Sequence, residues 1–292
     1  MKFTDRTVFT AVAIGIPITW LIAFRLYPIV YSAYLSFNTY YMLSGQVTFR
    51  GLSNYISLFN DSLFKVSLLN TIYISLGLGM VGVWIALGLA MALRSVKNPR
   101  IQTIYRTIIF IPAVTMMVAT AQAWTWMFQP SYGVINYLLS LIELGPFKWL
   151  TSPSEVIPAI IITTLWKTLG FTVVLFEAGL AGIPEGFYEA SEIDGATKWQ
   201  QFIHITWPLL TPATIFVFVT GLAAALQTFT QVYVMTMGGP GTSAYTLVFY
   251  VYQRAFTYKD LGYASAVAYV TFLIIFIASY LQLRYIKEKL WA

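Results

Sequence analysis

Few residues in this chain of 292 amino acids are equipped for catalysis. The sequence holds one histidine, His204, and no cysteine, which excludes disulfides, thiolate catalysis and cysteine metal sites. It contains neither a His-Glu-x-x-His zinc motif nor a Gly-x-x-x-x-Gly-Lys-Ser/Thr loop that would hold ATP phosphates. Because a lone histidine is more often solvated than a ligand, we predict no catalytic residue and no metal site.

Polar side chains inside long apolar stretches are the residues best placed for chemistry. Such groups are costly in a membrane and usually face the interior of a helix bundle or a water-filled path. Arg25, Lys167 and Glu177 are the charged candidates. Lys167 and Glu177 stand ten residues apart, which is about 15 Å along one helix, so they cannot pair directly.

A cluster of neutral polar residues follows a run of small ones near residue 225. Gln227, Thr228 and Gln231 are spaced at i, i+1 and i+4. Amides and hydroxyls suit a hydroxyl-rich solute such as a sugar, and Phe171 could stack on the face of a sugar ring. Small and polar residues also hold neighbouring helices together, so helix packing remains an alternative for each position.

A second concentration of polar residues occupies about 181–207. Its first part, from Glu185 to Asp194, is rich in acidic and small residues, and Asp194-Gly195 is a turn signal. After the turn, one helical face carries Trp199, Phe202, Ile203 and Thr206, and the other carries mostly Lys198, Gln200, Gln201 and His204. We predict a helix, a turn and a second helix at the membrane surface.

The elements that position these residues must lie in lipid. Only 10% of the residues are charged, 58% are hydrophobic and the mean hydropathy is +0.72, which cannot give a water-soluble surface. A helix needs about twenty apolar residues to cross the bilayer. We predict an all-α, polytopic membrane protein with one domain over 1–292 and six spans at about 8–30, 68–93, 107–128, 156–180, 209–234 and 263–283.

The distribution of lysine and arginine predicts the orientation of these spans, because cationic loops stay in the cytoplasm. One set of loops and ends holds Lys2, Arg6, Arg94, Lys97, Arg100, Arg106, Lys198, Arg284, Lys287 and Lys289. The opposite set holds only Arg50, Lys65, Lys148, Arg254 and Lys259. Both termini are therefore predicted to be cytoplasmic. The net charge of +6 comes without a basic run, so we predict no nucleic-acid partner.

The segment at 181–207 resembles the EAA loop of binding-protein-dependent ABC importer permeases, and we refer to it as the EAA loop. It contains Glu189-Ala190-Ser191, then Gly195, then Ile205-Thr206-Trp207-Pro208. The family pattern is Glu-Ala-Ala, a glycine four residues later, and Ile-x-Leu-Pro. Ser191 and Trp207 depart from that pattern, although serine keeps its position small.

Further stretches, spread over nearly the whole chain, are similar to the carbohydrate-uptake branch of these permeases. They are Asn70-Thr71, Arg106 to Pro112, Trp124, Gly133, Asn136, Trp166, Ala178 to Leu180, Tyr188 to Ala196, Thr236 to Pro240, Tyr252 to Phe256 and Gly262 to Ala266. Met237 stands where many relatives have glycine.

The resemblance implies a type I ABC importer permease fold and uptake of a sugar or oligosaccharide by alternating access across a bacterial or archaeal cytoplasmic (inner) membrane. It implies as partners a second, related permease, two ATPase subunits that hold ATP and Mg, and an extracytoplasmic solute-binding protein. The chain itself would bind no cofactor.

The same resemblance suggests roles for individual residues. We assign contact with the ATPase to Glu189, Ala190, Ser191, Asp194, Gly195, Ile205 and Pro208. We assign the substrate path to Lys167, Thr168, Phe171, Gln227, Thr228 and Gln231. Two alternatives stay open: an importer for another polar solute such as a sugar phosphate or polyol, which the cations Arg25 and Lys167 could favour, and a secondary transporter or channel.

Overall fold

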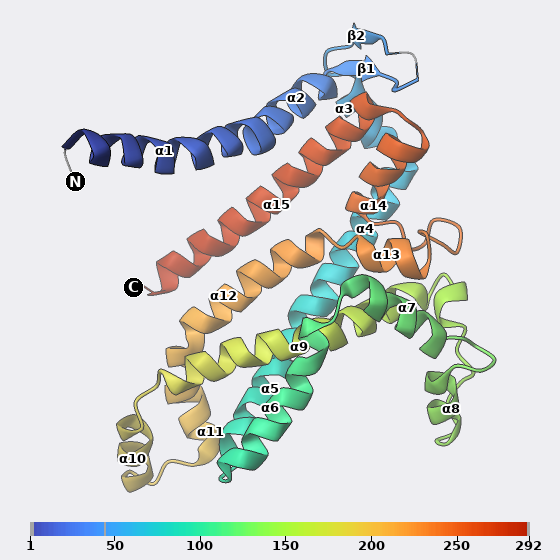
Figure 1. The fold of residues 1–292 in the computed structure, drawn as a ribbon. Helices are drawn as coiled ribbons and strands as arrows, with labels where there is room; N and C mark the ends of the chain where they lie inside the picture. The colour runs from blue at the N-terminus through green and yellow to red at the C-terminus, as the bar shows by residue number, and fades with distance from the viewer. Residues whose placement is uncertain (1–2, 44, 291–292) are drawn as a thin grey trace. The chain divides into compact units, whose positions relative to one another are not determined.

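The computed structural model describes residues 3–43 and 45–290, which are mostly helical (Figure 1). The α-helices are α1 (Phe3–Leu21), α2 (Tyr27–Ser36), α3 (Ser53–Asn60), α4 (Ser62–Leu76), α5 (Val83–Ser95), α6 (Pro99–Val114), α7 (Met117–Met127), α8 (Val134–Ser140), α9 (Val156–Ala181), α10 (Gly186–Ile193), α11 (Lys198–Gln201), α12 (Trp207–Leu226), α13 (Thr230–Met235), α14 (Leu247–Tyr252) and α15 (Leu261–Leu290). Short π-helical turns occupy Ile22–Leu26, Gly77–Gly82, Phe202–Thr206 and Gln253–Thr257, and a 3-10 turn occupies Trp149–Thr151.

Five continuous helices within 3–43 and 45–290 are long and apolar enough to span a membrane. They cover Val8–Ser36, Ser62–Ser95, Val156–Ala181, Lys198–Leu226 and Leu261–Arg284. A sixth candidate is the pair α6 and α7, which bends by 99°. The predicted all-α membrane fold with about six spans is therefore confirmed. Lys2 and Ala292, at the two predicted cytoplasmic ends, lie outside the described residues.

The predicted third span at 107–128 is not one continuous helix. Helix α6 ends at Val114, and Thr115 then takes an extended conformation. The Thr115 hydroxyl donates to the Pro112 carbonyl at 2.7 Å, which satisfies one of the carbonyls left open at the end of the helix. The apolar sequence continues through this point without glycine or a charged residue, so hydropathy alone gives no sign of the break.

The predicted fifth span at 209–234 differs at its start. The helix begins at Lys198 rather than Leu209, because a π-helical turn at Phe202–Thr206 joins α11 directly to α12. Pro208 explains the turn: proline offers no N–H to the preceding carbonyls and its ring crowds them. The second helix of the EAA loop is therefore continuous with the span.

The same span also ends early. Helix α12 ends at Leu226, residues 227–229 are not helical, and α13 begins at Thr230. The Thr246 hydroxyl donates to the freed Thr228 carbonyl at 2.7 Å. Irregular backbone at membrane depth needs such partners within the protein. Gln227, Thr228 and Gln231 thus lie at and just after a helix break, and not on one helical face.

The described residues form two compact units. One runs up to Phe64 and includes Tyr250–Leu273, and the other comprises Lys65–Phe249 and resumes at Ile274. The single domain over 1–292 stays a prediction.

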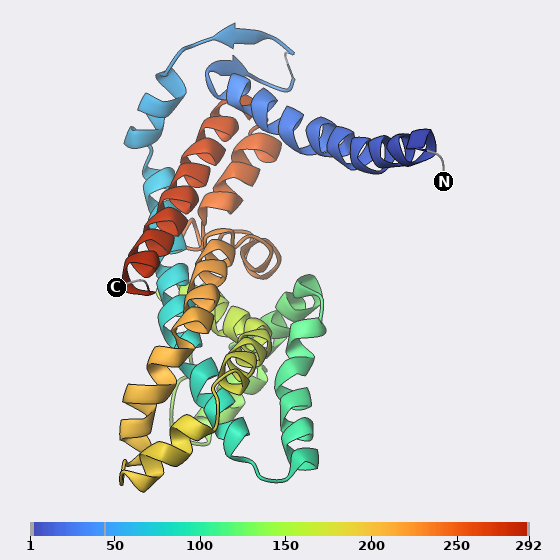
Figure 2. The same cartoon turned by 90° about the vertical axis from the view of Figure 1, so that its left-hand side faces the viewer.

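Helix α9 is the centre of the larger unit, where it packs against α5, α6 and α12 (Figure 2). Its buried side chains Val173, Phe176 and Leu180 join side chains of α5 and α12 in one core. The backbone at Gly170 approaches α6 so closely that an added Cβ would lie 2.2 Å from the Ile109 carbonyl oxygen. Close approach through small residues is the usual packing of helices in lipid.

Two of the sequence stretches named above are joined in the larger unit. The Asn70 side-chain amide donates to the carbonyls of Ser243 and Tyr245, each at 2.9 Å. The Thr71 hydroxyl accepts the N–H of Leu247 at 2.9 Å. Asn70-Thr71 therefore holds the loop that precedes α14.

The smaller unit contains a short hairpin that the sequence analysis did not predict. Strands β1 (Asn38–Tyr40) and β2 (Val47–Phe49) pair antiparallel, with Asn38 opposite Phe49. The Asn54 amide donates to the carbonyls of Ser36 and Asn38, each at 2.9 Å, and so ties α3 to the end of α2.

Candidate functional site

A cavity of about 490 Å³ opens beside α9 in the larger unit. Its wall is mainly apolar and comes from the region where α4 meets α5, from α6, α9 and α12, and from the break at 227–229. All the residues of the predicted path line it: Lys167, Thr168, Phe171, Gln227, Thr228 and Gln231. The structure brings these six residues together, and their contact with a substrate stays a prediction.

Three of the six come from α9. The Lys167 ammonium donates to the Ala113 carbonyl at 2.6 Å, at the end of α6 that the break leaves open. The Thr168 hydroxyl donates to the Thr164 carbonyl at 2.9 Å. Phe171, one turn beyond Lys167, leaves 55% of its surface exposed. The α9 face of the cavity therefore presents a cation, a hydroxyl and an aromatic ring.

The other three come from the break after α12 and from the start of α13, and they differ in exposure. Gln227 is exposed, and its amide nitrogen donates to the Ala223 carbonyl at 2.8 Å. Thr228 and Gln231 are buried, and they donate to the Ala225 carbonyl at 2.8 Å and to the Thr164 hydroxyl at 3.1 Å. Helix packing therefore accounts for Thr228 and Gln231, whereas Gln227 presents surface to the cavity.

Sequence reasoning missed further cavity residues on α9. Thr164 and Thr172 lie four residues before and four residues after the predicted Thr168, and all three line the cavity. The i, i+4, i+8 spacing places them on one helical face, so the sequence did contain this signal. Each hydroxyl donates to the carbonyl four residues earlier, which lets threonine lie in an apolar helix at little cost.

The EAA loop forms the predicted helix, turn and helix. Helix α10 ends at Ile193, Gly195 takes a φ of +77°, and Thr197 caps α11 in a capping box with Gln200. A positive φ favours glycine, which explains its place in the turn. The turn predicted at Asp194-Gly195 is confirmed.

One residue of the second helix differs from the prediction. Gln201, placed by periodicity on the polar face, is 3% exposed. Its amide donates to the Ser191 hydroxyl at 2.9 Å, so the two helices of the loop close on each other through it. The serine that departs from the family pattern has this hydrogen-bonding partner.

The predicted ATPase contact residues lie on the outer surface of the loop. Glu189, Ala190, Asp194, Gly195 and Pro208 are exposed, and Ser191 and Ile205 are half-buried. Beside them, Ile193 and Trp199 leave 87% and 67% of their surfaces exposed. Large apolar side chains exposed together with small residues are typical of a docking surface.

Arg94 connects the loop to α5 and was not predicted to do so. Its guanidinium donates to the Glu185 carboxylate at 3.0 Å and to the Leu180 carbonyl at 3.1 Å. It also lies 4.9 Å from the centre of the Tyr188 ring, and the Tyr188 hydroxyl is 2.9 Å from that of Thr206. These contacts join the ends of α9 and α12 to α10.

Glu177, a charged candidate from the sequence, belongs to neither the cavity nor the loop surface. It accepts two hydrogen bonds from Arg106, at 2.8 and 2.9 Å. Such a two-point ion pair fixes α6 against α9. The partner was not predicted because 71 residues separate the two positions.

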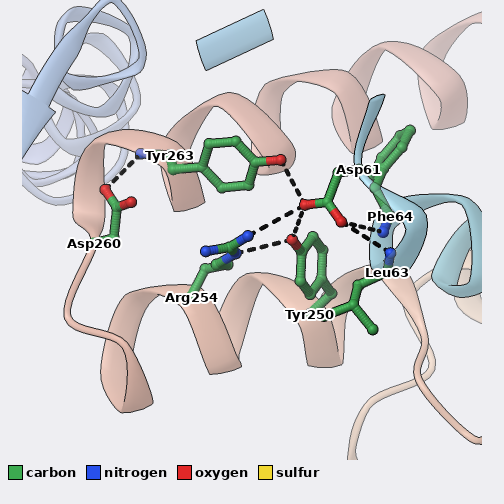
Figure 3. Close-up of polar contacts among 7 residues, drawn as sticks. All are labelled: Asp61, Leu63, Phe64, Tyr250, Arg254, Asp260 and Tyr263. Carbon is green, nitrogen blue, oxygen red and sulfur yellow. Dashed lines mark hydrogen bonds and ion pairs between the residues drawn. The ribbon is translucent and has the colours of Figure 1, made fainter. Parts of the chain in front are cut away.

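The smaller unit contains a third polar group, centred on Asp61 (Figure 3). One Asp61 oxygen accepts the N–H groups of Leu63 and Phe64, and the other accepts from Tyr250, from Tyr263 at 2.7 Å and from Arg254 at 3.2 Å. The Arg254 guanidinium lies 4.4 Å from the centre of the Tyr263 ring. We call this set the Asp61 cluster; its donors satisfy the carboxylate from within the chain.

Comparison with known proteins gives the chain a family context. A family model described as "Binding-protein-dependent transport system inner membrane component" matches residues 82–290, which include the EAA loop and all the cavity-lining residues except Leu78 and Gly79.

Curated relatives cover most of the chain. The sulfoquinovosyl glycerol transport system permease protein SmoG of Agrobacterium fabrum is 36% identical over 264 residues, covering 90% of this chain and 85% of the relative. The lactose transport system permease protein LacF of Rhizobium radiobacter is 34% identical over 270 residues, covering 91% and 90%. The trehalose/maltose transport system permease protein MalF of Thermococcus litoralis is 33% identical over 261 residues, covering 88% and 86%.

A solved structure has the same fold. A chain from the crystal structure of a bacterial alginate ABC transporter in complex with alginate pentasaccharide-bound periplasmic protein superposes with a TM-score of 0.83. The sequence identity is 22%, and the match covers 95% of this chain and 93% of that one.

Proposed function

Because the chain belongs to the family of binding-protein-dependent transport system inner membrane components, we propose that it is the permease subunit of an ABC importer for a sugar or oligosaccharide. Transport permeases for lactose, for trehalose and maltose, and for sulfoquinovosyl glycerol are among its relatives. It moves solute and catalyses no reaction of its own.

One structural observation carries this proposal. Two of the helices that line the cavity, α9 and α12, are the same two that enter and leave the EAA loop. A displacement of the loop therefore acts directly on these two parts of the cavity wall. No flexible linker lies between α11 and α12, because the π-helical turn makes them continuous.

The energy for transport comes from separate ATPase subunits, since the chain has no phosphate-binding loop. Two such subunits hold ATP and Mg, and one docks against α10 and the Gly195 turn. The exposed Ile193 and Trp199 give that contact an apolar component, and Glu189 and Asp194 give it charge.

A second permease subunit completes the path, and an extracytoplasmic binding protein delivers the sugar. One solved neighbour is described as a complex with a periplasmic protein that carries an oligosaccharide, which supports this set of partners. The EAA loop and both termini lie in the cytoplasm of a bacterium or archaeon, in keeping with the lysine and arginine distribution.

Reconstitution of the complete complex in proteoliposomes tests the function. Uptake of a labelled saccharide held by the binding protein should require ATP on the EAA-loop side and the binding protein on the other. Collapsing the ion gradients should leave the uptake rate unchanged. Uptake by a secondary transporter would depend on the ion gradients and not on ATP. Uptake through a channel would need neither ATP nor the binding protein.

The orientation has its own test. A reporter enzyme that is active only outside the cytoplasm, fused after Ala292, should give no signal, whereas the same fusion in the loop near Lys148 should be active. A strong signal from the fusion at Ala292 would contradict the proposed topology.

A further inference from the structure

The cavity beside α9 carries a positive charge that no described residue neutralises. Of the cavity-lining residues, all of which belong to the described part of the chain, Lys167 is the only one with an ionisable side chain. Its described partner is the Ala113 carbonyl. A carbonyl dipole stabilises an ammonium group but leaves its net charge in place.

Two other cations next to α9 are paired with carboxylates. Arg106 is paired with Glu177, and Arg94 with Glu185, so these positions are close to neutral. Charges inside a membrane protein normally pair or serve a function, because leaving one unpaired is costly. Lys167 lies in the cavity wall. Its ammonium group has three N–H donors, and two of them make no contact found among residues 3–43 and 45–290.

The residues near Lys167 indicate which kind of ligand its ammonium group would bind. Phe171 lies one helical turn away on the same face, about 6 Å along α9, and exposes its ring to the cavity. Aromatic faces bind sugar rings, and an ammonium binds carboxylate, sulfonate or phosphate oxygens. The pair therefore matches a sugar ring that carries an acidic group close to it.

We propose that the substrate of this cavity is an acidic saccharide, with the acidic group on Lys167 and the sugar ring on Phe171. This inference rests on the proposed function and specifies its substrate class. The exposed Gln227 amide and Thr168 hydroxyl then bind sugar hydroxyls across the cavity. Neutral sugars would leave the Lys167 charge unmatched and would pass more slowly.

The absence of cysteine from this chain permits a direct measurement of the cavity's charge. Thr168→Cys is introduced into the assembled complex and labelled with two thiol reagents of similar size, an anionic sulfonatoethyl and a cationic trimethylammonioethyl methanethiosulfonate. Mass spectrometry of this chain gives the two rates. Their ratio cancels the intrinsic reactivity of the thiol.

The anionic reagent should react faster, and adding Lys167→Gln should lower the anionic-to-cationic ratio by about tenfold. Lys167→Arg should preserve the ratio. At the exposed control position Ser140→Cys, outside the cavity, Lys167→Gln should leave the ratio unchanged. An unchanged ratio at Thr168→Cys would overturn the proposed role of Lys167.

Uptake of matched probes tests the substrate class itself. Proteoliposomes with the same binding protein are compared for digalacturonate and galactobiose, which differ in their carboxylates. The parent should favour the acidic probe, and Lys167→Gln should reduce that preference by about tenfold while Lys167→Arg retains it. An equal or greater preference for the neutral probe, unchanged in Lys167→Gln, would overturn the inference. Loss of ATP-dependent uptake for every saccharide tried would instead count against the proposed function.

Discussion

Arg254 and Lys167 are both cations held against helices, and the chain surrounds them in opposite ways. Arg254 lies in the Asp61 cluster, where a carboxylate, a tyrosine hydroxyl and tyrosine rings surround its guanidinium. Lys167 lies on a cavity wall, and one backbone carbonyl is the partner that the described residues give it. Asp61 neutralises the first charge, whereas no residue in the described part of the chain neutralises the second.

The difference separates polar groups that maintain the fold from those available to a ligand or a partner. Burial and hydrogen-bond partners make this distinction, whereas residue type alone does not. Gln231 and Gln227 repeat the contrast within one segment, since the first is buried against Thr164 and the second is exposed. Substitutions on the two sides of this contrast should therefore affect different measurements.

The largest effect on stability is expected from Asp61→Asn. Asparagine can still accept hydrogen bonds but leaves the Arg254 charge without its counter-ion. Breaking a largely buried ion pair from one side costs about 3 kcal/mol. Thermal unfolding of the purified protein measures the loss. The matched control is Asp260→Asn, because asparagine can still accept the Tyr263 N–H at the helix start, so a loss of about 0.5 kcal/mol or less is expected there. Equal losses in both variants would contradict the contrast.

The same cluster predicts a pH dependence. Burial raises the pKa of Asp61, but hydrogen bonds from Tyr250, Tyr263, Phe64 and Leu63 outweigh it and hold the pKa below its usual value. A lowered pKa means that the stabilisation is present above the unfolded pKa of about 3.9 and is lost as the pH falls through the folded value. The stability gap between the parent and Asp61→Asn should therefore be constant near neutral pH and close only in acid. A gap that closes between pH 6 and 8 would contradict this assignment.

The largest effect on transport, without a comparable effect on stability, is expected from Gly195→Pro. Proline cannot adopt a φ of +77° and removes the N–H that donates to the Glu192 carbonyl at 3.1 Å. ATP-driven uptake should fall by at least about tenfold, because a displaced loop no longer transmits force to α9 and α12. Gly195→Asn is the control, since asparagine tolerates positive φ. Normal uptake by Gly195→Pro would contradict a coupling role for the turn.

Smaller effects are expected from substitutions of the two glutamines: on uptake for Gln227 and on stability for Gln231. Gln227→Leu should reduce uptake several-fold and change the free energy of unfolding by about 0.5 kcal/mol or less, as is usual at exposed positions. Gln231→Leu removes a buried hydrogen bond and should cost about 1–2 kcal/mol of stability. Uptake by Gln227→Leu at the parental rate for every accepted saccharide would assign Gln227 to helix packing.

A smaller effect on stability than at the Asp61 cluster is expected from Lys167→Met. This variant loses the hydrogen bond to Ala113 and keeps most of the apolar stem, so it should cost about 1 kcal/mol or less. Arg254→Met should cost about three times as much, since it leaves Asp61 buried without its cation. The exposed Lys97→Met provides a baseline. Comparable losses for Lys167→Met and Arg254→Met would remove the basis of the comparison.

The sequence was most informative where the pattern is local. Long apolar runs predicted the spans, and Asp194-Gly195 predicted the turn. Rare polar residues within apolar runs, together with Phe171, predicted six of the residues that line the cavity. The helix breaks after Val114 and Leu226 could not be predicted in the same way. They depend on hydrogen bonds from Thr115 and Thr246. Pro112 lies two residues before the end of α6, and no proline or glycine occurs at 227–229.

Contacts between residues that are far apart in the sequence could not be predicted either. Asp61 and Arg254 are separated by 193 residues, and only the fold brings them together. Gln201 was placed on the polar face because periodicity describes one helix at a time, whereas α10 covers it through Ser191. Met237 is the opposite case: its φ of +50° explains why a glycine would suit that position, which the family resemblance had indicated.

The central claim is that the EAA loop controls access to the cavity, and labelling of Gln227→Cys in this cysteine-free chain tests it most directly. A membrane-impermeant maleimide is applied from the binding-protein side to complexes without nucleotide and to complexes trapped with ATP. The labelling rate should change by about tenfold or more between the two states. The change should disappear in complexes that also carry Gly195→Pro or Glu189→Lys and still retain their ATPase subunits. The same nucleotide-dependent change in both variants as in the parent would contradict the claim that this loop connects ATP hydrolysis to the cavity.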